Sequence, residues 1–109
     1  MKIALSGYGK MGKTIEKIAL DRGHEIVQKI TGDIEAFDLS AADIMIDFSL
    51  PDAAFKNIST AFSQNISVVC GTTGWLENYE RAMEKCKENN GGFIYASNFS
   101  VGVNLFFEL

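Results

Sequence analysis

Residues 7–12 read Gly-Tyr-Gly-Lys-Met-Gly, and this stretch decides the fold of the chain. It directly follows residues 2–6, a short apolar run with the length and composition of a buried strand. From Met11 onward, apolar residues recur at spacings of three and four, which is typical of a helix that packs against a sheet. The glycines therefore occupy the turn between a first strand and a first helix, where a βαβ unit holds phosphate groups.

Each glycine of this motif has its own expected role. Gly7 permits a tight turn, Gly9 lets a pyrophosphate approach the backbone, and Gly12 lets the helix lie close to the strand. The N-terminus of the helix adds unpaired N–H groups and the positive end of a dipole. The alternative is a turn that needs glycine only for its backbone conformation, but the placement of the motif favours dinucleotide binding.

The rest of the chain alternates between predicted strands and helices. We expect strands at residues 25–30, 43–48, 66–70 and 93–96. A helix is expected over residues 50–63, where Ser49 and Asp52 have the spacing of a capping box. Its inner face would consist of Ala54, Ile58, Ala61 and Phe62. A third helix is expected where apolar residues step by four, four and three, at Trp75, Tyr79, Met83 and Cys86. The alternation predicts an α/β fold, a doubly wound, Rossmann-type parallel sheet in a single domain.

Composition narrows the class of protein. The chain has 109 residues, of which 47% are hydrophobic and 22% charged, as expected for one globular domain. Its net charge of −4 argues against binding to nucleic acid or to an anionic membrane. No apolar run approaches the roughly 20 residues that cross a bilayer. We therefore expect a cytoplasmic protein that binds neither nucleic acid nor a membrane.

The residues that could serve as nucleophile, metal ligand or general acid are few. Cys70 and Cys86 fit neither a disulfide framework nor a zinc site, so we expect two buried structural thiols and no metal. His24 is the single histidine and follows Gly23 in a predicted turn, where we expect a solvated side chain. The sequence therefore predicts no catalytic residue in this chain.

The adenine end of a dinucleotide site usually has an acidic residue after the second strand. Asp33 is the candidate, because it lies 21 positions beyond Gly12, although Thr31 stands at the strand tip. Lys29 could reach a 2′-phosphate if its side chain points outward. An ordinary turn residue remains the alternative for Asp33, and the choice between NADH and NADPH stays open.

Other strand ends should meet the glycine turn at the same rim, because ligands of open α/β sheets lie outside the carboxyl ends of the strands. Threonine and serine there can cap a helix as well as bind a ligand, and both roles remain open for Thr72 and Thr73. The segments concerned are Phe48 and Ser49, Gly71 to Gly74, and Ala96, Ser97, Asn98 and Phe99.

Residues 101–109 are strongly apolar and lack a cap, a turn or a polar tail. We therefore expect residues 1–100 to form the dinucleotide-binding domain, with residues 101–109 beginning the connection to a substrate domain that the chain does not contain. Such a chain would be truncated before its C-terminal domain.

Taken in order, four motifs give the chain a family resemblance. They are G-x-G-x-M-G, I-D-F-S-x-P, G-T-T-G and A-S-N-F-S-V-G-V-N, and together they resemble dihydrodipicolinate reductase along the whole chain. This resemblance implies the NADH- or NADPH-dependent reduction of 4-hydroxy-tetrahydrodipicolinate in diaminopimelate and lysine biosynthesis. It also implies a homotetramer. The family's H-H-x-x-K-x-D-A-P-S-G-T-A segment, which supplies the proton donor and substrate contacts, has no counterpart in these residues.

The resemblance also assigns site residues. The pyrophosphate would be held by Gly7, Tyr8, Gly9, Lys10, Met11 and Gly12. Phe48 and Ser49 would line the cofactor, Gly71, Thr72 and Thr73 would contact the nicotinamide side, and Ala96, Ser97, Asn98 and Phe99 would close over it. The family often has an acid, frequently followed by arginine, where this chain has Thr31. A stand-alone NAD(H)-binding regulatory module without catalysis is the alternative function, and the apolar tail disfavours it.

Overall fold

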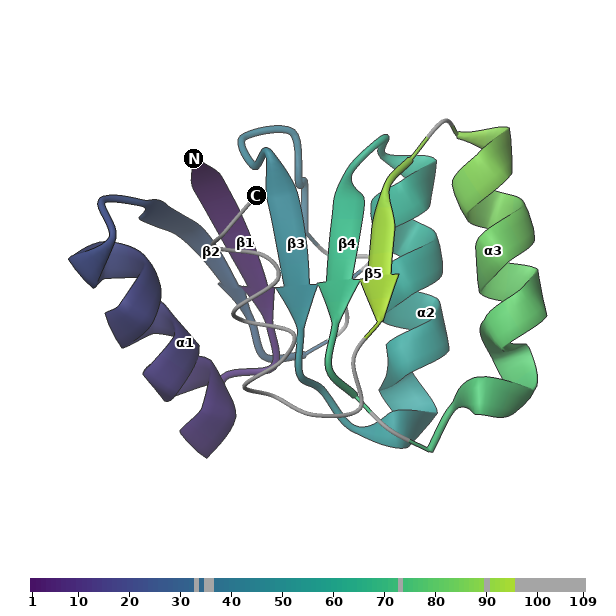
Figure 1. The fold of residues 1–109 in the computed structure, drawn as a ribbon, viewed down its shortest axis with the longest axis horizontal. Helices are drawn as coiled ribbons and strands as arrows, with labels where there is room; N and C mark the ends of the chain where they lie inside the picture. Colours follow the sequence, from purple (N-terminus) through teal and green to yellow (C-terminus); the bar gives the residue numbers. More distant parts are fainter. Residues whose placement is uncertain (33, 35–36, 73, 90, 96–109) are drawn as a thin grey trace.

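A computed structural model describes residues 1–32, 34, 37–72, 74–89 and 91–95, and Figure 1 shows their arrangement. Strands and helices alternate along the chain, as the apolar pattern predicts. The elements are β1 (Lys2–Ser6), α1 (Lys10–Asp21), β2 (Glu25–Ile30), β3 (Ile44–Asp47), α2 (Pro51–Ser63), β4 (Ser67–Cys70), the 3₁₀ turn η2 (Leu76–Asn78), α3 (Tyr79–Glu88) and β5 (Phe93–Tyr95).

The five described strands form one sheet in the order β2-β1-β3-β4-β5, and every neighbouring pair is parallel. The prediction of a doubly wound parallel sheet is confirmed. The chain leaves β1 toward β2 on one side and then returns to place β3 on the other side. This reversal opens a crevice at the carboxyl ends of β1 and β3, where ligands of such sheets bind.

Alternating side chains along the strands build two apolar layers. On one face, Ile3, Leu5 and Val69 share a core with Ile15 and Ala19 of α1. On the other face, residues of the alternate positions pack beneath α2 and α3. Figure 1 shows the single helix α1 at one end of the sheet and the pair α2 and α3 at the other. Because α1 covers one face of the sheet and α2 and α3 cover the other, the sheet is the middle layer of the fold.

Helix α2 begins differently from the prediction. Leu50 is the N-cap, and no described side chain makes a capping hydrogen bond at this end. The predicted capping box is wrong because the Ser49 hydroxyl donates instead to the Asp47 carboxylate, 2.9 Å away. The predicted inner face is confirmed, since Ala54, Ile58, Ala61 and Phe62 are all buried.

The third predicted helix is split. Trp75 precedes both η2 and α3, and its indole N–H donates to the Thr72 carbonyl at 2.7 Å. Its ring meets Phe93 and Tyr95 edge to face, with centroids 6.1 and 5.7 Å apart. Trp75 therefore anchors the turn after β4 to the sheet rather than starting a helix.

The two cysteines are buried and unpaired, as predicted. Burial, with the nearby Asp47 carboxylate, raises the pKa of the Cys70 thiol to about 12, so this group stays protonated. His24 is half-buried in the turn before β2. The helices of the described residues are all too short or too polar to span a membrane.

Candidate functional site

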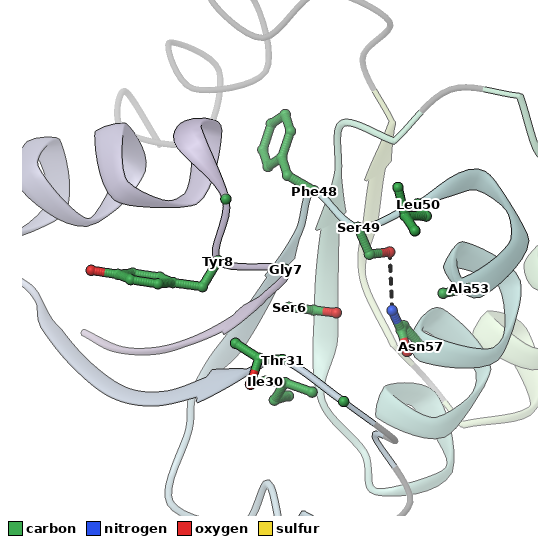
Figure 2. Close-up of a pocket in the computed structure, with 12 residues that line it drawn as sticks. Ser6, Gly7, Tyr8, Ile30, Thr31, Phe48, Ser49, Leu50, Ala53 and Asn57 are labelled. Atoms are coloured by element: carbon green, nitrogen blue, oxygen red, sulfur yellow. Dashed lines mark hydrogen bonds between the residues drawn. The ribbon is translucent and has the colours of Figure 1, made fainter.

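A hollow of about 450 Å³ opens at the point where the strand order reverses. Figure 2 shows that its walls come from the ends of β1, β2 and β3 and from the start of α2. The residues that line it are Ser6, Gly7, Tyr8, Gly9, Ile30, Thr31, Gly32, Phe48, Ser49, Leu50, Ala53 and Asn57.

The three glycines of the motif differ in what surrounds them. Gly7 has a φ of +89°, and a β-carbon there would lie 2.5 Å from the Phe48 carbonyl oxygen. A β-carbon at Gly12 would lie 2.5 Å from the Gly7 carbonyl oxygen, so helix and turn touch at this point. A β-carbon at Gly9 would meet no described atom within 4 Å. Gly7 and Gly12 are required by packing, whereas Gly9 leaves open space beside the hollow.

Helix α1 presents a free N-terminus to this space. Gly9 is its N-cap, and the described residues supply neither a capping side chain nor an acidic residue in its first turn. The first N–H groups and the positive end of the helix dipole therefore remain for an anion. Lys10 and Lys13 of the same helix add positive charge nearby.

Backbone hydrogen bonds join the loops around the hollow. The Gly7 N–H donates to the Ile30 carbonyl, and the Phe48 N–H donates to the Ser6 carbonyl, each at 2.9 Å. The Gly71 N–H donates to the Asp47 carbonyl at the same distance. The parallel ladder thus continues one step past the strands, which fixes the rim of the hollow to the sheet.

The wall formed by the end of β2 contains Thr31 and Gly32. Of the described residues that line the hollow, none carries a formal charge. The Lys29 ammonium lies 2.7 Å from a Glu16 carboxylate oxygen and 4.5 Å from the centre of the Tyr8 ring. Asp33, the predicted ribose ligand, lies outside the described residues.

Tyr8 lines the hollow with its backbone side, while its ring points away toward α1, as Figure 2 shows. Its hydroxyl donates to Glu16 at 2.5 Å. The hydrogen bond from Lys29 lowers the pKa of Glu16, and the bond from Tyr8 acts in the same direction. The Lys29–Glu16 ion pair and the neutral Tyr8 side chain form a cluster next to the glycine turn.

The residues predicted for the nicotinamide side divide into three groups. Phe48 and Ser49 line the hollow. Gly71 lies against the Phe48 ring and Thr72 is buried, so both stand behind the lining. The remaining predicted residues, Thr73, Ala96, Ser97, Asn98 and Phe99, lie outside the described residues. Of the residues predicted for the pyrophosphate, three do not line the hollow: Lys10, Met11 and Gly12 belong to the first turns of α1.

Several residues of the site were missed in the sequence. Asn57 and Ala53 face the hollow from α2, and Leu50 stands at its mouth with 75% of its surface exposed. Asp47 is completely buried behind the lining. The spacing of Ala53 and Asn57 along a helix is a usable signal, because residues four apart share a face. Nothing in the local pattern distinguishes Asp47 from an ordinary strand end.

A second hollow of about 430 Å³ adjoins the first. The two share Gly32, Leu50, Ala53 and Asn57, and the second adds Ile34, Asp52 and Lys56. The second hollow therefore extends the first along α2.

The parallel sheet and the hollow at its reversal define a domain of the doubly wound, Rossmann-type α/β class. A hyperthermophilic archaeal homoserine dehydrogenase mutant in complex with NADPH has this fold, with a TM-score of 0.67 and 21% identity over 86% of this chain and 43% of that one. The dipicolinate-bound dihydrodipicolinate reductase from Paenisporosarcina sp. TG-14 matches with a TM-score of 0.80 and 21% identity, over 99% of this chain and 51% of that one.

The family model for the N-terminus of dihydrodipicolinate reductase matches residues 1–99. The chain belongs to this family, and the predicted resemblance is confirmed. The 4-hydroxy-tetrahydrodipicolinate reductase of Christiangramia forsetii is 60% identical over the whole chain and 46% of its own length. The enzyme of the same name from Neisseria meningitidis serogroup B is 29% identical over the whole chain and 49% of its own length. The chain thus spans about half the length of these relatives.

Proposed function

We propose that this chain is the cofactor-binding part of a 4-hydroxy-tetrahydrodipicolinate reductase and that it binds NADH or NADPH in the hollow beside Gly9. The open space at Gly9 carries this proposal, because a pyrophosphate can approach the backbone only where no side chain intervenes. The uncapped N-terminus of α1 adds the N–H donors and positive dipole that a diphosphate needs.

The chain's own residues would bind and orient the cofactor, which when bound supplies the hydride. Gly7 and Gly9 would hold the pyrophosphate, and Ser49 and Phe48 would contact the part beyond it. Thr31 and Gly32 would border the adenosine ribose. In the described part of the chain, this wall is uncharged.

Substrate binding and proton donation are proposed to lie elsewhere in the protein. Tyr8 is the only titratable side chain in the described lining, and its hydroxyl is engaged by Glu16. We therefore propose that a further domain supplies the proton donor and the contacts with the small-molecule substrate. A homotetramer in the cytoplasm is proposed for the whole protein, on the family resemblance alone.

Titration calorimetry with NADH and with NADPH tests the cofactor site in the full-length protein. Gly9→Val places a branched side chain in the open space, where a β-carbon would have no described atom within 4 Å. We expect the fold to persist and the affinity for both cofactors to fall at least about tenfold, or about 1.4 kcal/mol. Ala41→Val, at an exposed position before β3, is the matched control. Unchanged affinity in folded Gly9→Val protein would rule out the pyrophosphate site.

A further inference from the structure

The buried carboxyl group of Asp47 joins three elements behind the hollow. Asp47 ends β3 and has no exposed surface. One carboxylate oxygen accepts from the Ser49 hydroxyl at 2.9 Å and from the Asn57 amide at 3.3 Å. The other oxygen accepts from the Thr72 hydroxyl at 2.8 Å and lies 3.7 Å from the Cys70 sulfur. Through these bonds the carboxyl group connects the end of β3 with α2 and with the turn after β4.

Two of these partners face the hollow, and they are also bonded to each other. The Asn57 amide donates to the Ser49 hydroxyl oxygen at 3.0 Å, which is the dashed line in Figure 2. One side-chain amide has two N–H groups, so Asn57 can serve Ser49 and Asp47 together. This closed triangle fixes the rotamer of Ser49 at the wall of the hollow.

The triangle also determines what the Ser49 hydroxyl can offer a ligand. A hydroxyl group has one hydrogen and two lone pairs. The hydrogen is used by Asp47, and one lone pair receives the Asn57 amide. Only the second lone pair of the Ser49 hydroxyl remains for a hydrogen bond from a ligand. Ser49 therefore faces the hollow as an acceptor of hydrogen bonds.

We propose that Asp47 is a positioning residue that makes Ser49 an obligatory hydrogen-bond acceptor for a donor group of the bound cofactor, a ribose hydroxyl or a carboxamide N–H. This inference rests on the proposed cofactor site. A leucine at position 47 would have a similar volume but no oxygen to accept the Ser49 hydrogen. The Ser49 hydrogen would then no longer be held, and its fixed polarity would be lost.

Calorimetry with NADH on the full-length protein tests this role through a double-mutant cycle. Ser49→Ala removes the acceptor, and we expect affinity to fall about threefold to tenfold, as for one neutral hydrogen bond. Asp47→Leu should produce a similar fall. Combined with Ser49→Ala, it should add no further loss, because its effect passes through that hydroxyl. Ser49→Thr, which keeps the hydroxyl, should retain most of the affinity.

A purely structural role for Asp47 predicts another pattern. Asp47→Leu would then weaken NADH binding by the same factor whether residue 49 is serine or alanine, and this result would overturn the proposal. Unchanged affinity in Ser49→Ala would also overturn it, even if Asp47→Leu failed to fold. Asp43→Asn, an exposed acid just before the same strand, controls for the loss of charge and should leave affinity unchanged. Wild-type protein that fails to bind NADH would contradict the cofactor site itself.

Discussion

Gly71 lies against the aromatic ring of Phe48, so closely that a β-carbon at position 71 would overlap the ring. The two residues follow neighbouring strands, and the Gly71 N–H also donates to the backbone of Asp47. Phe48 is one of the residues that line the hollow. The absence of a side chain at Gly71 therefore allows Phe48, a residue of the binding site, to keep its position.

Gly71→Ala is expected to displace the Phe48 ring and to weaken NADH binding about threefold to tenfold. The ring can move because it is partly exposed, so the stability of the fold should change less than the affinity. In a Phe48→Ala background, the same substitution should have no additional effect, since the clash has been removed. Calorimetry of the four proteins measures this coupling, and additive losses would contradict it.

Gly12→Ala and Gly9→Ala should separate packing from ligand access. The first places a methyl group 2.5 Å from the Gly7 carbonyl oxygen, where neither backbone segment can yield easily. We expect it to lower the free energy of unfolding by about 1–3 kcal/mol. The second enters open space and should change that energy by less than about 1 kcal/mol. Urea unfolding of both variants checks the contrast, and equal destabilisation would contradict it.

The stability difference between wild type and Asp47→Asn should depend on pH. Burial raises the pKa of Asp47, while hydrogen bonds from Thr72, Ser49 and Asn57 oppose the shift. The folded protein therefore binds this proton more tightly than the unfolded chain, in which the pKa of an aspartate is about 4. The resulting stabilisation is complete below that value and is lost as the pH rises through the folded-state pKa.

Asp47→Asn lacks this contribution. Relative to wild type it should be least stable near pH 4 and should gain as the pH rises, by up to about 1.4 kcal/mol per unit. Urea unfolding at several pH values measures the difference, with Asp43→Asn as the control for charge. A difference that stays constant from pH 4 to pH 8 would disagree with this expectation.

Asp33→Ala tests the adenosine end of the site. A carboxylate that accepts from the ribose hydroxyls also repels a 2′-phosphate, so the change should weaken NADH more than NADPH. Loss of bonds to a charged acceptor should cost about 1.5–3 kcal/mol, or roughly tenfold and more in affinity. Small and equal changes for both cofactors would mark Asp33 as a turn residue. In that case Thr31→Ala becomes the informative variant, because Thr31 lines the hollow.

The sequence predicted those parts of the fold that depend on local pattern. The bounds of β1 and β2 agree with the apolar runs that each lead into a turn with glycine. The sequence also predicted Gly7, Gly9, Phe48 and Ser49 at the hollow, because they follow strands that end at one edge of the sheet.

The errors come from contacts between distant segments. The capping box failed because Ser49 bonds to Asp47 instead of to the start of α2. Trp75 has helical spacing, but its ring packs edge to face against Tyr95 of β5 and its indole N–H donates to the Thr72 carbonyl. The role of Asp47 depends on Thr72, which is 25 residues away, and no local pattern contains that information.

The hydrogen bonds from Gly7 to Ile30, from Phe48 to Ser6 and from Gly71 to Asp47 have a consequence for folding. Each bond joins loops that meet only after adjacent parallel strands have paired, so the hollow cannot exist in a partly assembled chain. A ligand that occupies it would select the complete sheet over every intermediate. At a concentration 100 times its dissociation constant, such a ligand would add about 2.7 kcal/mol to the cooperative unfolding transition. Ligand occupancy would then report on the integrity of the sheet from β2 to β4.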